Sequence, residues 1–361
     1  MLSRLYSVLL PLFAGILLAY VPCAVAAPLT KERVVLYASV DQNGDSLTLS
    51  GKVREPEGVP AKGVVLLPHY TLTADKEAPS NKGTKEPQYI PEDYIVLMPD
   101  QIGFGATKDR TQLYLVGELT ARNCVDMLLA ENLPDSLPVY VVGYSQGAAS
   151  AMWIIRLLEE QYADRVPLKQ GFVGSGPYDV AAMYDIGVAQ NYTTLPLSIP
   201  LLIEGMNVAY GLDLRTKDFY TRATERCYRR HIAGKKKGVT EIFINMMNRK
   251  MTHWLSPQGM DKSLPQTRRL YTCFLHSSLV HYPVEGTAGT DTVCPSWQPR
   301  TPVYVFHSTT DDVVPFFNAE HVKRCFVSAP FTYDFDDHGT HIKSMPVFFN
   351  HVRDVLSGQA E

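Results

Sequence analysis

The stretch PVYVVGYSQGAAS, residues 138–150, decides the fold class of this chain. Residues 139–143 are apolar and mostly β-branched, which predicts a buried strand, and the alanines after Gly147 begin a helical pattern. Ser145 stands between Gly143 and Gly147, which leave room for a sharp turn that would expose its hydroxyl at the carboxyl edge of a sheet. An ordinary turn containing a serine would look the same, so the interpretation depends on the rest of the chain.

Further apolar runs along the chain predict more strands of the same sheet. Continuous apolar runs are what a parallel sheet covered on both faces requires, and helical patterns lie between several of them. The alternation predicts an α/β fold with a mostly parallel sheet flanked by helices. A hairpin with its turn at Asn43-Gly44 would add antiparallel strands at one edge. The predicted hairpin strands are 33–40 and 46–53, the other strands 63–68, 94–100, 139–145, 170–175, 302–308 and 331–335, and the helices 117–132, 146–162, 317–329 and 341–356.

The alternation stops between residues 180 and 298. This stretch is rich in Tyr, Met and Pro and contains helical patterns such as TEIFINMMNRKM, residues 240–251, without clear parallel strands. It predicts a mainly helical cap or lid inserted into a core formed by residues 27–179 and 299–361. The triple lysine 235–237, bracketed by glycines, reads as a solvated loop.

A serine hydroxyl is a poor nucleophile unless a histidine takes its proton and an acid orients that histidine. Asp311 and Asp312 closely follow one predicted strand, and His338 follows the last strand, with His341 three residues further on. The chain order Ser, Asp, His is the order expected for a nucleophile at a strand-to-helix turn. The backbone N–H of Gln146, at the start of the following helix, points to the same place and could stabilise a negative oxygen.

The motifs GYSQG, HSTTDDVVP and DDHGTH, with LMPDQIGFGATKDRTQLYL upstream, resemble the α/β-hydrolase superfamily and, more narrowly, its secretory lipase and esterase branch. The resemblance covers roughly residues 60–340. It implies that the acid stands four residues before a proline, which selects Asp311, and that the base follows the last strand directly, which selects His338. Asp312 and His341 remain the alternatives.

The resemblance also has an implication for the loop after the strand at residues 63–68. The motif PHYT contains His69, which matches a histidine common on the loop that gives the second oxyanion donor. The N–H of Thr71 or, less favoured, of Tyr70 would then complete the oxyanion hole with the N–H of Gln146. His307 lies within a strand pattern and reads as a packed core histidine.

Composition limits the kinds of partner and the compartment. Residues 1–26 have one cation, an apolar run and small residues at 24 and 26, which predicts a signal peptide cleaved after Ala26 and a secreted or periplasmic protein. Removing Arg4 leaves 33 Lys and Arg against 37 Asp and Glu, which argues against a nucleic-acid or anionic-membrane partner held by bulk charge. The five remaining cysteines match no zinc pattern and predict no definite disulfide, and Cys124 and Cys325 read as small buried side chains.

The sequence therefore predicts a serine carboxylic ester hydrolase that uses Ser145, Asp311 and His338, with no metal and no cofactor. Its substrate would be a small-molecule ester or lipid; the oligomeric state stays open. An exported serine peptidase of the same fold is the first alternative, because it would use the same three residues. A non-catalytic binding protein of this fold is the second, although such relatives usually lack one member of the triad.

Overall fold

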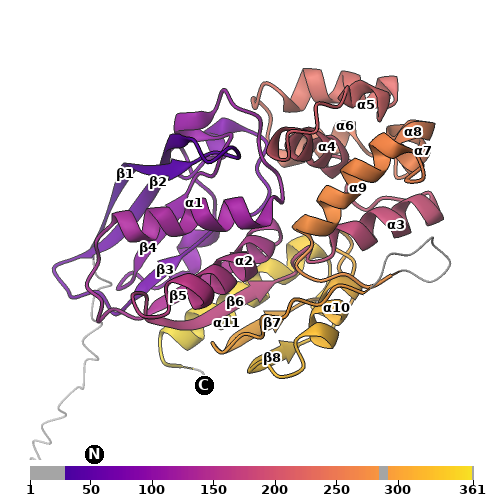
Figure 1. The fold of residues 1–361 in the computed structure, drawn as a ribbon. Helices are drawn as coiled ribbons and strands as arrows, with labels where there is room; N and C mark the ends of the chain where they lie inside the picture. Colours follow the sequence, from indigo (N-terminus) through magenta and orange to yellow (C-terminus); the bar gives the residue numbers. More distant parts are fainter. Residues whose placement is uncertain (1–28, 284–291, 360–361) are drawn as a thin grey trace, which may run out of the picture.

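An eight-stranded sheet forms the centre of the molecule in the computed structural model, which describes residues 29–283 and 292–359 (Figure 1). The predicted signal peptide and residues 284–291 of the predicted insertion lie outside the described residues. The strand order is β1-β2-β4-β3-β5-β6-β7-β8, antiparallel at β1, β2 and β4 and parallel from β4 to β8. The strands are β1 (Leu29–Val40), β2 (Ser46–Glu57), β3 (Val64–Leu66), β4 (Ile95–Pro99), β5 (Val139–Tyr144), β6 (Leu168–Gly174), β7 (Val303–Phe306) and β8 (Phe331–Asp334).

Both faces of the parallel part of the sheet are buried, as the apolar runs predict. Alternate residues of β5 belong to different cores: Val141 packs in the cluster that includes α1 (Gly117–Ala130) and α2 (Gln146–Gln161). Val142 packs in a second cluster with Phe348 and Phe349 of α11 (His341–Leu356). In Figure 1, α1 and α2 lie before the sheet and α11 behind it. The sequence prediction of a helix-flanked, mostly parallel sheet is therefore confirmed.

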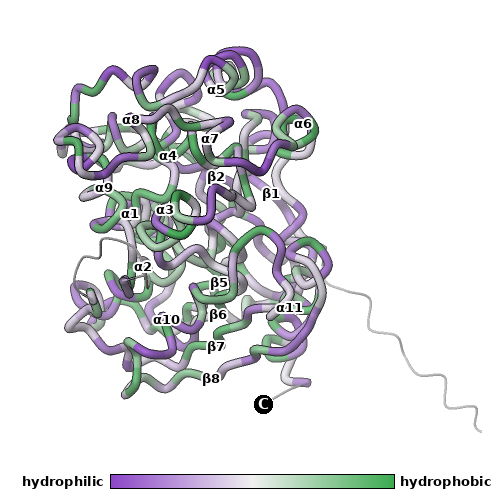
Figure 2. Tube along the Cα trace, turned by 90° about the vertical axis from the view of Figure 1, so that its right-hand side faces the viewer, coloured by the Kyte–Doolittle hydropathy of each residue, from purple (hydrophilic) through white to green (hydrophobic). Residues whose placement is uncertain are grey.

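The chain between β6 and β7 forms helices, and residues 180–283 of it are called the helical insertion here. Figure 2 shows the insertion above the strands. The helical pattern at 240–251 is confirmed only as far as Asn245, since residues 246–250 are not helical. In this non-helical stretch the Asn248 carbonyl accepts the Trp254 indole N–H at 2.6 Å. The helices are α3 (Val180–Gln190), α4 (Ser198–Ala209), α5 (Arg222–Cys227), the π-helix η5 (Tyr228–Ile232), α6 (Val239–Asn245), α7 (Met251–Trp254), α8 (Pro257–Met260) and α9 (Pro265–Ser277), with a short 3-10 turn, η4 (Thr216–Asp218).

One disulfide corrects the reading of the cysteines. Cys325, near the end of α10 (Phe317–Cys325), is bonded to Cys294, and their Cα atoms are 5.2 Å apart. The bond ties the segment that enters β7 to the helix that follows it, a neighbourhood that only the sheet topology creates. Cys124 is a free buried thiol, as predicted. Within residues 29–283 and 292–359, no helix combines the length and apolar character needed to cross a membrane.

Candidate active site

Ser145 occupies a sharp turn between β5 and α2. Its backbone has φ 56° and ψ −124°, a conformation that costs energy for a residue with a side chain. The two glycines make this turn possible: a Cβ on Gly143 would lie 2.1 Å from the Gly147 carbonyl oxygen, and a Cβ on Gly147 would lie 2.3 Å from that of Pro68. The Ser145 N–H donates to the carbonyl of Gly174 at 2.8 Å, which anchors the turn to β6. The sequence thus places Ser145 at the carboxyl edge of the sheet, as predicted.

The histidine that reaches Ser145 is His341. Its Nε2 lies 3.0 Å from Ser145 Oγ, and its Nδ1 lies 2.7 Å from Asp311 Oδ2. His341 is the first residue of α11 and is 5% exposed, so this chain of hydrogen bonds is largely removed from water. Strand, loop and helix N-terminus therefore bring together three residues in the geometry of an acid, a base and a nucleophile.

His338 does not reach Ser145, so its selection as the base is corrected. Its Nε2 bonds to Asp334 Oδ1 at 2.7 Å, and its ring stacks on Phe306 with centroids 4.8 Å apart. Gly339, with φ 82°, turns the chain after His338. As a result, the N-terminus of α11, and not the loop before it, faces the strand-to-helix turn at Ser145, called the elbow from here on. His341 stands at the first position of α11, next to the edge of the sheet.

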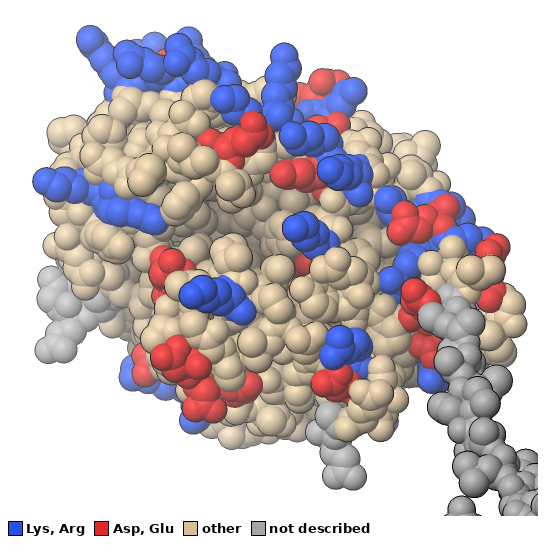
Figure 3. Space-filling view, turned by 180° about the vertical axis from the view of Figure 1, so that it is seen from behind, with Lys and Arg blue, Asp and Glu red and all other residues tan. Residues whose placement is uncertain are grey.

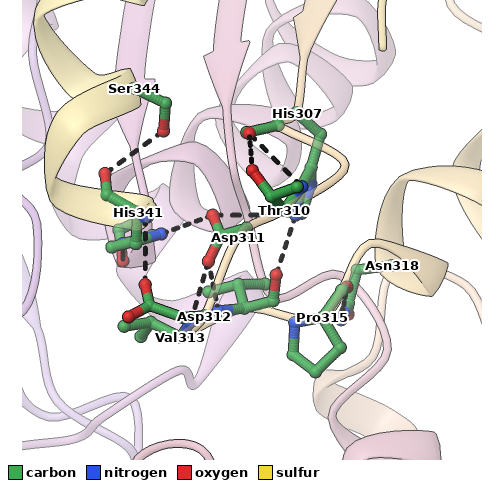
Figure 4. A network of polar contacts seen from close by, with 12 residues as sticks. His307, Thr310, Asp311, Asp312, Val313, Pro315, Asn318, His341 and Ser344 are labelled. Atoms are coloured by element: carbon green, nitrogen blue, oxygen red, sulfur yellow. Dashed lines mark hydrogen bonds and ion pairs between the residues drawn. The ribbon is translucent and has the colours of Figure 1, made fainter. Parts of the chain in front are cut away.

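The two neighbouring aspartates have different partners (Figure 4). Asp311 faces His341, and its Oδ1 also accepts the N–H groups of Val313 and Val314 at 2.9 and 2.8 Å. Asp312 turns to the start of α11, where its Oδ1 accepts the N–H of His341 at 3.1 Å. The structure therefore brings Asp311, and not Asp312, to the imidazole, in line with the sequence selection.

The surroundings of Asp311 favour its charged form. Burial raises the pKa of the carboxyl, but hydrogen bonds from His341 and Val313 and the nearby imidazoles outweigh it, so the pKa lies below its ordinary value. His307 is fully buried beside it, with Nε2 donating to the Val314 carbonyl at 2.9 Å. Burial lowers the pKa of His307 to about 4, so this imidazole is neutral at physiological pH. The prediction of His307 as a buried core residue is confirmed.

The predicted oxyanion donors lie on two segments in direct contact. Gln146 is the first residue of α2, and the loop before Thr71 touches the same helix where Gly147 approaches Pro68. Within the described part of the chain, neither the Gln146 nor the Thr71 amide donates a hydrogen bond, whereas the Tyr70 amide faces Glu86 Oε2 at 3.4 Å. In the described residues the Thr71 amide is therefore free to donate, whereas the Tyr70 amide already has an acceptor.

Side-chain contacts fix the loop that carries Thr71. The buried His69 ring bridges the carbonyls of Tyr70 at 2.6 Å and Asp100 at 3.1 Å. Thr71 Oγ1 contacts the hydroxyl of Tyr114 at 3.0 Å. These contacts hold the loop against the end of β4 and beside the elbow.

An apolar pocket of about 360 Å³ opens next to Ser145. Most of its wall belongs to the helical insertion, chiefly α3, α4, α7 and α9. Core residues such as Leu115 and Phe317 complete it on the side of the sheet. Representative lining residues of the insertion are Val180, Met183, Ile199, Leu202, Leu270 and Phe274.

Sequence reasoning missed two side chains that position the site. The Tyr144 hydroxyl donates to the carbonyl of His341 at 2.7 Å, and Ser308 Oγ accepts the His338 N–H and donates to the Gly339 carbonyl at 2.6 Å. Both hold the loop between β8 and α11. Tyr144 and His341 are 197 residues apart, so no local pattern could have linked them.

Comparison with known families gives a match over most of the chain. Residues 88–351 match the model of the secretory lipase family. The chain belongs to the secretory lipase family. Members of this family are hydrolases of the lipase and esterase type, and the predicted resemblance is confirmed. A sequence comparison with curated proteins gives no significant match.

Solved structures show the same fold at low sequence identity. The rice cell wall degrading esterase LipA from Xanthomonas oryzae is 20% identical with a TM-score of 0.75, and 92% of each chain is covered. A hydrolase from Legionella pneumophila is 18% identical with a TM-score of 0.72 over 91% of this chain and 89% of its own. Candida antarctica lipase A is 15% identical with a TM-score of 0.64 over 92% of this chain and 79% of its own. The α/β-hydrolase fold spans nearly the whole chain.

Proposed function

We propose that this protein is a secreted serine carboxylic ester hydrolase that acts through an acyl-enzyme intermediate. The observation that carries the proposal is the hydrogen-bond chain from Asp311 through His341 to Ser145, with distances of 2.7 and 3.0 Å. In this proposal Ser145 is the nucleophile, His341 the base and Asp311 the acid. The strained, glycine-flanked turn at Ser145 supports it, because such strain is typical of a nucleophile held at a strand-to-helix elbow.

The geometry supports a two-step acyl transfer. His341 Nε2 takes the Ser145 proton as Oγ attacks the ester carbonyl, and Asp311 holds the imidazole in the tautomer that leaves Nε2 free to accept. The imidazolium then gives the proton to the leaving alcohol oxygen as the C–O bond of the ester breaks. A water molecule, deprotonated by the same nitrogen, attacks the acyl-enzyme, and the Ser145 oxygen leaves with the proton.

The negative oxygen of each tetrahedral intermediate needs donors that are not already used. The N–H groups of Gln146 and Thr71 fit this role, since Gln146 directly follows Ser145, the loop before Thr71 contacts the same helix, and neither N–H donates to another group in the described residues. One such donor typically lowers the activation barrier by about 3 kcal/mol. The contacts of His69 would then keep the second donor in place.

The apolar pocket is evidence that the substrate has a hydrocarbon acyl chain and that the helical insertion forms a cap over it. A pocket of about 360 Å³ whose walls are mostly aliphatic and aromatic favours a hydrocarbon acyl chain over a peptide, which would need partners for its backbone groups. No charged side chain lines this pocket in the described residues. We therefore assign the acyl chain to the insertion and the ester bond to the core.

The test is a panel of p-nitrophenyl esters of graded chain length, run beside aminoacyl p-nitroanilides on the mature protein and on Ser145→Ala. Ester turnover should fall by about a million-fold in the variant, as for loss of a nucleophile in related chemistry. Turnover of the anilides without turnover of the esters would show that the protein is a peptidase and not an ester hydrolase. Ester turnover that survives the substitution would remove Ser145 from the mechanism.

Export is a separate part of the proposal. The family match and residues 1–26, with their apolar run and Ala26, support it. Expression of the full chain with N-terminal sequencing of the exported product should find Ala27 as the first residue. Retention of Met1 on a protein that stays with the cells would overturn it.

A further inference from the structure

The charges of this protein are unevenly divided along the chain. Residues 215–250 contain eleven of the 34 Lys and Arg and three of the 37 Asp and Glu, a net charge of +8. The whole chain carries −3, so the other residues together carry −11. This segment lies entirely within the helical insertion, and Figure 3 shows Lys and Arg side chains gathered along the upper edge of the molecule. The surface formed by residues 215–250 is called the basic surface.

The few carboxylates of the basic surface do not neutralise it. Asp218 pairs with Arg215 and Glu225 with Arg229, each at 2.7 Å. Glu241 accepts the N–H of Gly238 at the start of α6, 3.0 Å away. Of the remaining cations, Lys235, Lys237 and Arg249 are half-buried. The others are exposed and, among the residues that the structure describes, lack a carboxylate within 4 Å; they are Lys217, Arg222, Arg226, Arg230, Lys236 and Lys250.

The lysine loop at residues 235–237 is a fixed platform and not the simple solvated loop of the sequence prediction. The Lys235 ammonium turns inward and donates to the carbonyls of Lys108, at 2.6 Å, and of Arg110. The Lys237 carbonyl accepts the Thr73 hydroxyl at 2.8 Å. Core loops hold the backbone on both sides of Lys236, which is exposed to solvent. Binding through Lys236 would therefore lose little conformational entropy of the loop.

The same segment also has exposed apolar side chains. Ile244 on α6 is 65% exposed and Met247, just after the helix, is 68% exposed, although Ile242 and Met246 of the same stretch are fully buried. The same segment adjoins the pocket, since the Thr193 N–H donates to the Arg249 carbonyl at 2.7 Å and Thr193 lines the pocket. Exposed apolar residues flanked by Lys and Arg are typical of surfaces that lie in a membrane interface.

We propose that the basic surface docks this protein onto anionic lipid, with the cations over the headgroups and Ile244 and Met247 among the upper acyl chains. Charge complementarity selects an anionic surface, and the two exposed apolar side chains select lipid over a purely polar polyanion. The bulk charge of the chain argued against such a partner, because it averages the insertion with the acidic remainder. The inference goes beyond the proposed function and does not need it.

Sedimentation with vesicles tests the docking on the mature Ser145→Ala protein, which removes catalysis from the measurement. Vesicles of phosphatidylcholine with one quarter phosphatidylglycerol should bind at least about tenfold more tightly than pure phosphatidylcholine, and salt should weaken this binding. A fourfold variant, Arg222→Glu, Arg226→Glu, Arg230→Glu and Lys236→Glu, should lose that preference. Ile244→Ser with Met247→Ser should weaken binding at high salt, where screening leaves the apolar contribution.

A matched control reverses four exposed cations elsewhere, Lys31, Lys62, Lys169 and Arg353, for the same change in net charge, and should keep the preference. The same variants made on the wild-type Ser145 background should still hydrolyse a soluble butyrate ester, which shows that they fold. Equal binding to neutral vesicles, equal loss in the control, or tighter binding to heparin than to the vesicles would overturn the docking. If the protein bound vesicles but its wild-type form hydrolysed no ester, the docking proposal would stand and the proposed function would be overturned.

Discussion

The α/β core and the helical insertion carry different parts of this molecule's chemistry. The core contributes Ser145 directly after β5, Asp311 in the loop after β7 and His341 at the start of α11. The insertion contributes most of the apolar pocket and the basic surface, and none of the three hydrogen-bonded residues. The positions of the three core residues are set by one edge of the sheet. The properties of the pocket and of the basic surface depend only on which side chains line a cavity or face water.

The difference teaches where sequence patterns are informative. A strand-to-helix elbow accepts few residues at each position, so it leaves a readable motif at residues 143–147. An apolar wall can be built from many combinations of aliphatic and aromatic residues, so it leaves none. Substitutions in the two regions should therefore differ in kind as well as in size.

The largest expected effect tests which histidine belongs to the core machinery. His341→Ala should lower kcat/KM for esters by about a million-fold, as expected for loss of the base. His338→Ala should leave turnover near the wild-type level, because His338 contacts Asp334 and Phe306 and not Ser145. Steady-state kinetics on a butyrate ester measures both. A large loss in the His338 variant alone would show that the loop rearranges in the working enzyme.

The next effect separates the two neighbouring aspartates. Asp311→Asn should lower kcat by about 10⁴-fold, because an amide cannot hold the imidazole in the required tautomer. Asp312→Asn is the matched control: its side chain can still accept the N–H of His341, so activity should stay close to that of the wild type. The pH profile of kcat/KM should keep its shape in the control. Equal losses in both variants would contradict the assignment of Asp311 as the acid.

One carboxyl in each region has a raised pKa and gives a smaller effect, on stability. Glu86, in η2 (Glu86–Tyr89) of the core, is fully buried, and burial raises its pKa to about 8. Between pH 4.5 and 8 the folded state keeps a proton that the unfolded state releases, so this group lowers stability as pH rises. Glu86→Gln should therefore raise the free energy of unfolding by a few kcal/mol, on the order of 1.4 per pKa unit, at pH 8 and little at pH 4.5.

Glu204 on α4 is the counterpart in the insertion. Burial also raises its pKa, but hydrogen bonds from Thr216 and Tyr220 oppose that shift. Glu204→Gln should consequently show a smaller gain at pH 8 than Glu86→Gln. Urea unfolding at the two pH values measures both variants. If Glu86→Gln raised the free energy of unfolding equally at both pH values, the stabilisation would not come from the titration of Glu86.

The smallest effect changes selectivity without touching the chemistry. Leu202→Trp narrows the pocket from α4 and should lower kcat/KM for long-chain esters by about tenfold or more relative to short ones. Leu157→Trp on α2 is a matched control at another half-buried leucine outside the pocket, and should leave the chain-length profile unchanged. An unchanged chain-length profile in the Leu202 variant would show that the acyl chain does not bind in this pocket.

The sequence by itself determined the fold class and the turn at Ser145, and its resemblance to a family selected Asp311. Apolar runs and the two glycines around Ser145 are local requirements of strands and sharp turns, and local requirements can be read from neighbouring residues. Each of these matches an element or contact of the structure.

Only the tertiary structure decided between His338 and His341, paired Cys294 with Cys325, and formed the pocket. Only Gly339 and Thr340 separate the two histidines, and the direction of each side chain depends on where α11 packs against the sheet and on Tyr144, which is far away in sequence. The basic surface also needed coordinates, because exposure and pairing, not the count of charges, determine which cations are free to meet a partner. Long-range packing sets these features, and a local pattern contains no record of it.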